Sequence, residues 1–89
     1  MSNNLTPRQK EILILTAKGL NERQVTRKLK LGKGTVKNHF NNRKSDNGYS
    51  GIYERMGIVS SQTAAVVRAL QLGIITLDEI YTFLFNQKN

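Results

Sequence analysis

Apolar residues recur at helical spacing along most of the chain, and capping residues mark where each helix starts. The segment Thr6-Pro7-Arg8-Gln9 combines a capping hydroxyl, a proline at the first helical position and a glutamine three residues after the cap. Apolar side chains follow from Ile12 to Leu15, and Gly19 is suited to end the helix. This pattern predicts a first helix over about residues 7–18.

A second helix is predicted over about residues 22–30. Asn21 can cap it, with Gln24 reaching back to the cap. A tight turn, Leu31-Gly32-Lys33-Gly34, follows this helix. Glycine so close to the next helix start is unfavourable for the helix, which indicates that Gly34 meets a demand for close approach or for unusual backbone torsions.

A third helix is predicted over Thr35–Arg43. Val36 and Phe40 form its apolar stripe, and polar side chains occupy the other faces. Two short helices joined by a tight glycine-containing turn, the second polar on one face, form a helix-turn-helix through residues 20–43. We expect His39 to lie in the core or to make an interhelix hydrogen bond, with a phosphate contact as the alternative.

The second half of the chain begins with a loop over residues 43–51, which is rich in turn formers and has no apolar periodicity. Three helices are predicted after it: Ile52–Met56 stopped by Gly57, a helix capped by Ser60 or Ser61 that runs to about Leu72, and a C-terminal helix over residues 76–87 opened by the capping box Thr76-Leu77-Asp78-Glu79. No segment requires a strand. The sequence therefore predicts a single all-α domain over residues 1–89.

The net charge of +8 is concentrated in one half of the chain. Residues 1–44 hold eleven Lys and Arg against two acids, and residues 45–89 hold three against four. From Arg23 to Lys44 there are eight basic residues and no acid. Such a one-sided distribution favours a polyphosphate partner, because each cation that meets a phosphate releases a counterion. The alternative is a solvated surface that happens to be basic.

Several classes of protein are disfavoured by what the chain lacks. Without cysteine there are no disulfides, thiolate nucleophiles or cysteine-ligated zinc, and the single histidine has no Asp/Glu cluster to complete a metal site. There is no Ser/His/Asp set or carboxylate pair, so we expect neither an enzyme nor a cofactor or metal. No apolar run approaches the roughly 18 residues that span a bilayer, and no signal peptide is recognisable, so we expect a cytoplasmic protein without membrane contact.

Several short motifs, in order, resemble the four-helix DNA-binding domain of LuxR-type bacterial transcription regulators. They are Leu5-Thr6-Pro7-Arg8, Gly19-Leu20, Gly34-Thr35-Val36-Lys37-Asn38-His39 and Met56-Gly57-Ile58. The resemblance covers about residues 5–73 and is specific only in aggregate. It implies that the third helix enters the major groove of duplex DNA and that the fourth helix of the family domain forms a homodimer. It also implies a stand-alone regulator.

The chain departs from this family after its third helix. The family's recognition helix normally runs unbroken into the segment that corresponds to Met56, whereas residues 43–51 read here as an insertion of about nine residues. The expected architecture is therefore a LuxR-type domain with an insertion after the recognition helix, which covers about residues 34–43, and with an extra C-terminal helix.

Three sets of site residues follow from the resemblance and from side-chain chemistry. Lys suits guanine O6 and N7, and Asn suits adenine N6 and N7, so the candidates for base contacts are Lys37, Asn38, Asn41 and Asn42, the last in place of Asn41 if the insertion rotates the helix. The candidates for phosphate contacts are Arg23, Arg27, Lys33, Thr35, Arg43 and Lys44. The candidates for the dimer interface are Ala64, Val67, Arg68 and Gln71.

Each set has a structural alternative. Thr35 can simply cap the third helix, and Arg43 and Lys44 can be loop charges without a partner. The small residues Ala64, Ala65, Val67 and Ala69 permit close helix approach, either between two copies or within one chain. At the level of the whole protein, the alternatives are a protein-interaction adaptor that has lost DNA binding and a sigma-like promoter-binding module. RNA polymerase or another regulator is a further candidate partner.

Overall fold

The computed structural model describes residues 5–41 and 51–80, and all the regular secondary structure in these residues is helical. The elements are α1 (Pro7–Ala17), α2 (Glu22–Lys28), α3 (Thr35–Asn41), α5 (Ile52–Met56) and α6 (Gln62–Gln71). A further helix begins at Leu77 and is described to residue 80. The predicted all-α fold class is confirmed. None of these described helices has the length and apolar character needed to cross a bilayer.

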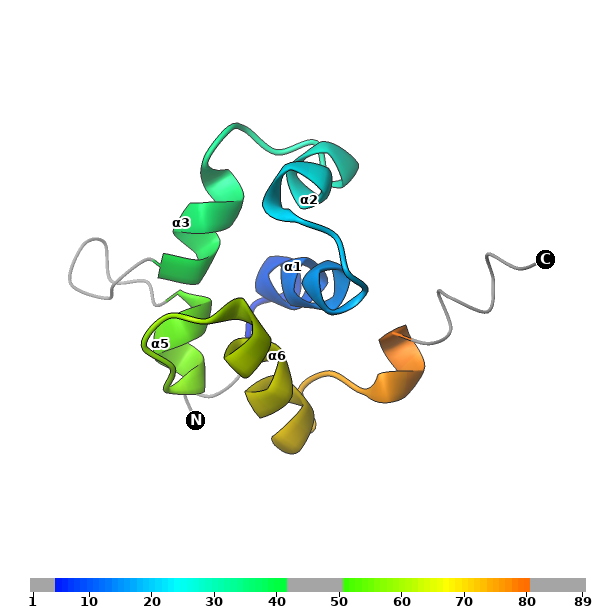
Figure 1. Ribbon diagram of the computed structural model, residues 1–89, viewed down its shortest axis with the longest axis vertical. Coiled ribbons are helices and arrows are strands. Elements are labelled where there is room, and N and C mark those ends of the chain that lie inside the picture. Colours follow the sequence, from blue (N-terminus) through cyan, green and yellow to red (C-terminus); the bar gives the residue numbers. More distant parts are fainter. Residues whose placement is uncertain (1–4, 42–50, 81–89) are drawn as a thin grey trace.

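Helix α1 lies in the middle of the molecule, with α2 and α3 above it and α5 and α6 below it in the view of Figure 1. It packs against α2, α3 and α6, while α5 bridges α3 and α6. Each of α1, α2, α3, α5 and α6 contributes to one apolar core, whose buried members are Ile12, Leu13, Leu15, Val25, Val36, Phe40, Ile52, Met56, Ala65, Ala69 and Ile75. Because α3 contacts α1, α2 and α5, this core fixes the position of α3 in the domain.

The predicted helix starts are confirmed by side-chain hydrogen bonds. Thr6 and Gln9 form a reciprocal capping box at α1, in which the buried Gln9 Oε1 accepts from the Thr6 N–H at 3.0 Å. Asn21 and Gln24 form the same arrangement at α2. Ser61, rather than Ser60, caps α6 by accepting from the Ala64 N–H at 3.1 Å.

Helix α2 ends at Lys28, two residues earlier than predicted. Lys30 has a φ of 56° and is the one described residue other than glycine with a positive φ. Its N–H donates to the Arg27 carbonyl, and the Leu31 N–H donates to the Thr26 carbonyl at 2.9 Å. These bonds form a Schellman motif, which satisfies the last carbonyls of α2 and turns the chain away from the helix. In α1, α5 and α6 the equivalent left-handed position is glycine: Gly19, Gly57 and Gly73.

The left-handed backbone torsion of Lys30 predicts that glycine at this position stabilises the protein. Replacing glycine at another left-handed position, Gly57, is the control and should have the opposite effect. Lys30→Gly is expected to raise the free energy of unfolding by about 0.5–1 kcal/mol, because relief of side-chain strain outweighs the extra chain entropy of glycine. Gly57→Ala is expected to lower it by about 1 kcal/mol, since φ is 71° there and an added Cβ meets no neighbouring atom within 4 Å. Urea denaturation measures the free energy of unfolding of both variants. If both substitutions stabilised the protein, or both destabilised it, this explanation would be contradicted.

The segment after α6 is part of the folded domain. Ile75 is 1% exposed, and Ile80 is also buried. Thr76 and Glu79 form the predicted capping box, and the second carboxylate oxygen of Glu79 lies 3.4 Å from Lys10 Nζ on α1. The start of the predicted C-terminal helix is thus confirmed, while its remainder over residues 81–87 lies outside the described residues, as does most of the inserted loop, residues 43–50.

Candidate nucleic-acid interface

The unit formed by α2, its following turn and α3 is a helix-turn-helix held to the core by three buried side chains, Val25, Val36 and Phe40. The turn before α3 is tight, with the Thr35 N–H donating to the Gly32 carbonyl at 3.1 Å. Gly34 has a φ of 82°, and an added Cβ there would meet no atom within 4 Å. Of the two demands predicted for Gly34, the structure therefore shows the torsional one and not close approach.

The outward face of α3 carries three of the predicted base-contacting residues. Lys37, Asn38 and Asn41 are exposed, whereas Val36 and Phe40 face the core. The Asn41 side-chain amide donates to the Lys37 carbonyl at 3.1 Å, so in the isolated domain this side chain bonds its own helix. A bidentate contact between Asn41 and adenine therefore requires another rotamer, whereas no such competing bond is found for Lys37 or Asn38 among the described residues.

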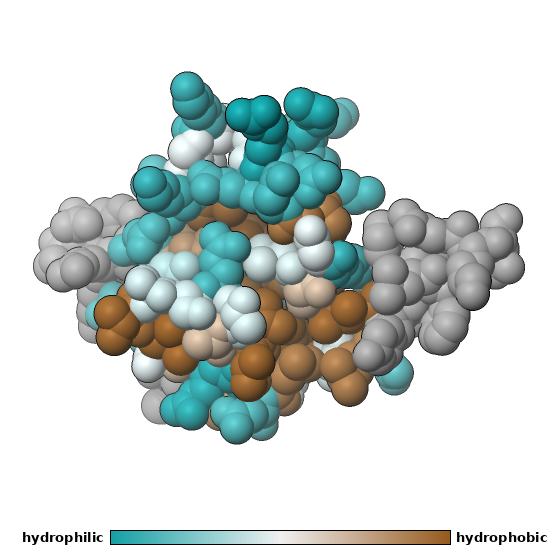
Figure 2. All heavy atoms as spheres, in the orientation of Figure 1, coloured by the Kyte–Doolittle hydropathy of each residue, from teal (hydrophilic) through white to brown (hydrophobic). Residues whose placement is uncertain are grey.

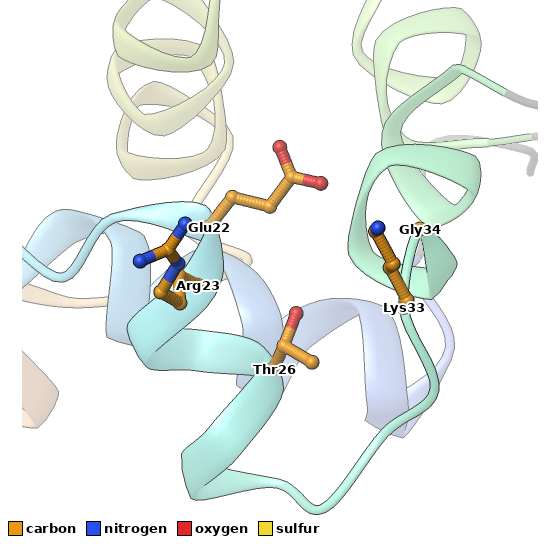
Figure 3. Close-up of a pocket in the computed structure, with 5 residues that line it drawn as sticks. All are labelled: Glu22, Arg23, Thr26, Lys33 and Gly34. Carbon is orange, nitrogen blue, oxygen red and sulfur yellow. The ribbon is translucent and has the colours of Figure 1, made fainter.

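A pocket of about 410 Å³ lies between α2 and the start of α3 (Figure 3). It is lined by Glu22, Arg23, Thr26, Lys33 and Gly34. Two of the predicted phosphate-contacting residues, Arg23 and Lys33, thus come together from opposite sides of one concave surface. A concavity with two cations and one acid in its lining carries a net positive charge, which can attract an anion such as a phosphate.

The other predicted phosphate-contacting residues are placed differently. Arg27 is exposed on α2 but does not line this pocket. Thr35 is the first residue of α3 and not its cap, because the Asn38 N–H donates to the carbonyl of Gly34 at 3.0 Å. The alternative role of Thr35 as the helix cap is therefore wrong. The remaining phosphate candidates, Arg43 and Lys44, lie outside the described residues, as does the base-contact candidate Asn42.

Hydrophilic residues cover the end of the molecule formed by α2 and α3. Figure 2 shows them at the top of the view, with a band of hydrophobic residues across the lower half and further hydrophilic residues at the lower margin. Among the described residues, the exposed large apolar ones are Val59, Val67, Leu72 and Leu77. The surface that surrounds the pocket is thus the polar end of the domain.

Helix α6 presents the four predicted dimer residues as one outward stripe. Arg68 and Gln71 are exposed, Val67 is 50% exposed, and Ala64 is half-buried. In contrast, Ala65 and Ala69 are fully buried in the core of their own chain. The small residues of α6 therefore lie on two different faces. Ala65 and Ala69 pack within the chain, because α6 lies against α1 and α5, whereas Ala64 and Val67 belong to the outward face.

His39 lies half-buried on α3, but the interhelix hydrogen bond predicted for it is not found. Its Nδ1 atom is buried and has no hydrogen-bond partner among the described residues. Burial lowers the pKa of the imidazole, and the nearby Arg8 guanidinium lowers it further. Arg8 is itself paired with Glu11 at 3.0 Å. The neutral form of His39 is therefore the one that the fold accommodates.

The lowered pKa of His39 predicts that acid weakens the fold. Because the folded state binds the proton less readily than the unfolded chain, stability is constant above the ordinary histidine pKa of about 6.5 and falls as the pH drops below it. Thermal melts between pH 7.5 and pH 5 are expected to show a falling Tm, and His39→Gln is expected to flatten this dependence. If Tm fell equally for the wild type and for His39→Gln, titratable groups other than His39 would be responsible for the loss of stability in acid.

Two features of this region were missed from the sequence. Tyr53 on α5 stacks near Phe40, with ring centroids 5.2 Å apart, although the inserted loop separates the two residues. Glu22 lines the pocket between α2 and α3, whereas the sequence shows it only as one of two acids in a basic half. The helical spacing of Glu22 and Thr26, which places both on one face of α2, is the signal that was available for Glu22.

Comparison with known proteins gives one match. The family model described as "Bacterial regulatory proteins, luxR family" matches residues 3–68, which are 66 of the 89 residues. No curated protein and no solved structure matches the chain. The matched range includes α1 to α5 and most of α6, and ends before the segment that contains Ile75 and Glu79.

Proposed function

Since the chain belongs to the luxR family of bacterial regulatory proteins, we propose that it is a transcription regulator that recognises a specific sequence in duplex DNA with α3 in the major groove. The observation that carries this proposal is the juxtaposition of an exposed polar face on α3 with a pocket lined by two cations. The face supplies Lys37 and Asn38, and the pocket supplies Arg23 and Lys33. Recognition of DNA needs both, because phosphate contacts fix the register and base contacts specify the sequence.

Each group of side chains has a distinct role in this proposal. Lys37 donates to guanine O6 and N7, and Asn38 pairs with adenine N6 and N7, with Asn41 or Asn42 extending the contact along the groove. The backbone of the DNA is held by Arg23, Arg27, Lys33 and Thr35, and by Arg43 and Lys44 of the insertion. A regulator of this kind acts on DNA in the bacterial cytoplasm.

Two single substitutions separate these roles. Asn38→Ala is expected to cost about 1–3 kcal/mol of discrimination at one base pair, because the bidentate amide contact is lost. Lys33→Ala is expected to weaken binding to all duplexes alike and to leave the sequence preference unchanged. Selection from random duplexes followed by titration of the selected sequences measures both effects. An unchanged base preference for Asn38→Ala would remove this residue from the proposed readout.

The proposal includes a homodimer formed through α6. The outward stripe of Ala64, Val67, Arg68 and Gln71 supports it, because Val67 exposes half of an apolar side chain beside the exposed Arg68 and Gln71. Two copies related by a two-fold axis would read two half-sites about 34 Å apart, one helical turn of DNA. Sedimentation velocity at micromolar protein tests this part of the proposal, which predicts twice the mass of the chain.

A further inference from the structure

Glu22 is an acid in a pocket that otherwise favours anions. It lines the space between α2 and α3 together with Arg23 and Lys33 (Figure 3). Nevertheless, Glu22 forms no ion pair with any residue in the described part of the chain. An exposed carboxylate is thus left available on the surface that is proposed to meet DNA.

Local helix stability explains why an acid is tolerated at this position. Glu22 is the first residue of α2, where the helix dipole favours negative charge by roughly 0.3–1 kcal/mol. An acid on another face of the first turn, pointing to solvent, would interact with the helix dipole equally favourably. The dipole does not explain why the carboxylate lines the pocket, where its charge opposes the attraction of Arg23 and Lys33 for phosphate.

We propose that Glu22 is a specificity-determining residue, whose carboxylate accepts a hydrogen bond from the N4 amino group of a cytosine at the edge of the DNA site. This inference rests on the proposed function. An ionised carboxylate has acceptors and no donor, so it pairs with the amino group of cytosine and is repelled by the O6 and N7 acceptors of guanine and the O4 of thymine. Adenine offers an amino group beside the N7 acceptor and pairs less well.

The position of the pocket agrees with a contact at the edge of the site. In helix-turn-helix proteins the N-terminal residues of the recognition helix contact base edges, while the preceding helix crosses the DNA backbone. The pocket lies at that junction, because Lys33 and Gly34 directly precede α3 and Glu22 and Arg23 begin α2. Arg23 and Lys33 can therefore hold phosphates while Glu22 meets the base next to them. A wrong base there leaves the carboxylate desolvated without a donor.

The test compares wild type with Glu22→Gln and with a control of equal charge change, Glu11→Gln. Glu11 is paired with Arg8 on α1 and does not line the pocket. Selection from random duplexes is expected to give sites with a preferred cytosine for wild type and for Glu11→Gln. Glu22→Gln is expected to lose that preference and to bind an unrelated duplex about eightfold more tightly at roughly 0.1 M salt, as one additional effective positive charge implies.

A second variant distinguishes the effect of the negative charge of residue 22 from the effect of its contact with a base. It also keeps an acid at the start of α2, so that the helix is not weakened by loss of the charge. Glu22→Asp keeps the negative charge at the start of α2 but shortens the side chain, so it is expected to weaken the cytosine preference without raising the affinity for unrelated DNA. A cytosine preference that both Glu22 variants retain would overturn the proposal, even if Glu22→Gln bound all duplexes more tightly. Failure of the wild type to bind any duplex would instead overturn the proposed function.

Discussion

Replacing Phe40 by alanine is expected to remove about 3–5 kcal/mol, a large part of the stability of the domain. Phe40 is 1% exposed and has the largest of the fully buried side chains among the described residues. It joins α3 to the core and stacks near Tyr53 of α5. Truncation of a buried phenylalanine costs about 3–5 kcal/mol. A domain of this length has a total stability of only about 4–13 kcal/mol, so α3 would be poorly held or the chain unfolded.

Urea denaturation followed by circular dichroism measures this loss. Phe40→Leu is the matched control, because it keeps an apolar side chain in the same site and should cost less than alanine. A loss below about 1 kcal/mol for Phe40→Ala would contradict the role of Phe40 as the link between α3 and the core, since a cavity of this size costs several times more. The same measurement shows which variants remain folded for DNA-binding experiments.

The second large effect is expected from removing both cations of the pocket. Arg23→Gln combined with Lys33→Gln should lower the affinity for duplex DNA about sixtyfold for each protomer bound at roughly 0.1 M salt, because each lost phosphate contact forfeits the release of about 0.9 counterion. The plot of log affinity against log salt should become shallower by about 2 for each protomer bound. The base preference should remain, since neither residue is proposed to read a base.

A variant with the same charge change elsewhere makes this prediction specific. Lys10→Gln combined with Lys18→Gln also removes two cations, but Lys10 on α1 and Lys18 at its C-terminal cap both lie near Glu79 and do not line the pocket. This control should keep most of the affinity and the wild-type salt dependence. Equal losses in the two double variants would show that net charge, rather than the pocket between α2 and α3, determines binding.

Helix starts were well predicted because their signals are local. Thr6, Asn21, Ser61 and Thr76 are capping residues whose hydrogen bonds involve backbone groups only a few positions away. The end of α2 was misjudged because Lys30 adopts the left-handed torsion that is taken by glycine at the other such positions in the described residues. Residue type is a good guide to such an end only when the residue is glycine or asparagine.

The candidate site was predicted only where a single helix defines it. The buried stripe of Val36 and Phe40 fixes which face of α3 is exposed, so the outward position of Lys37 and Asn38 follows from spacing alone. The pocket depends on how α2 and α3 are placed relative to one another. The spacing of Glu22 and Thr26 shows that they share a face of α2, but not that this face lies opposite Lys33 and Gly34, and the carboxylate of Glu22 was therefore missed.

The most direct test of DNA recognition by this surface is a titration of the wild-type chain with a selected duplex at several salt concentrations. If the five cations proposed to hold the backbone, Arg23, Arg27, Lys33, Arg43 and Lys44, each meet a phosphate, log affinity should fall against log salt with a slope of about −4.5 for each protomer bound. Binding to an unrelated duplex should be weaker by roughly a thousandfold or more, as is typical of specific recognition. An affinity that is indifferent to salt, or equal for the two duplexes, would contradict the account.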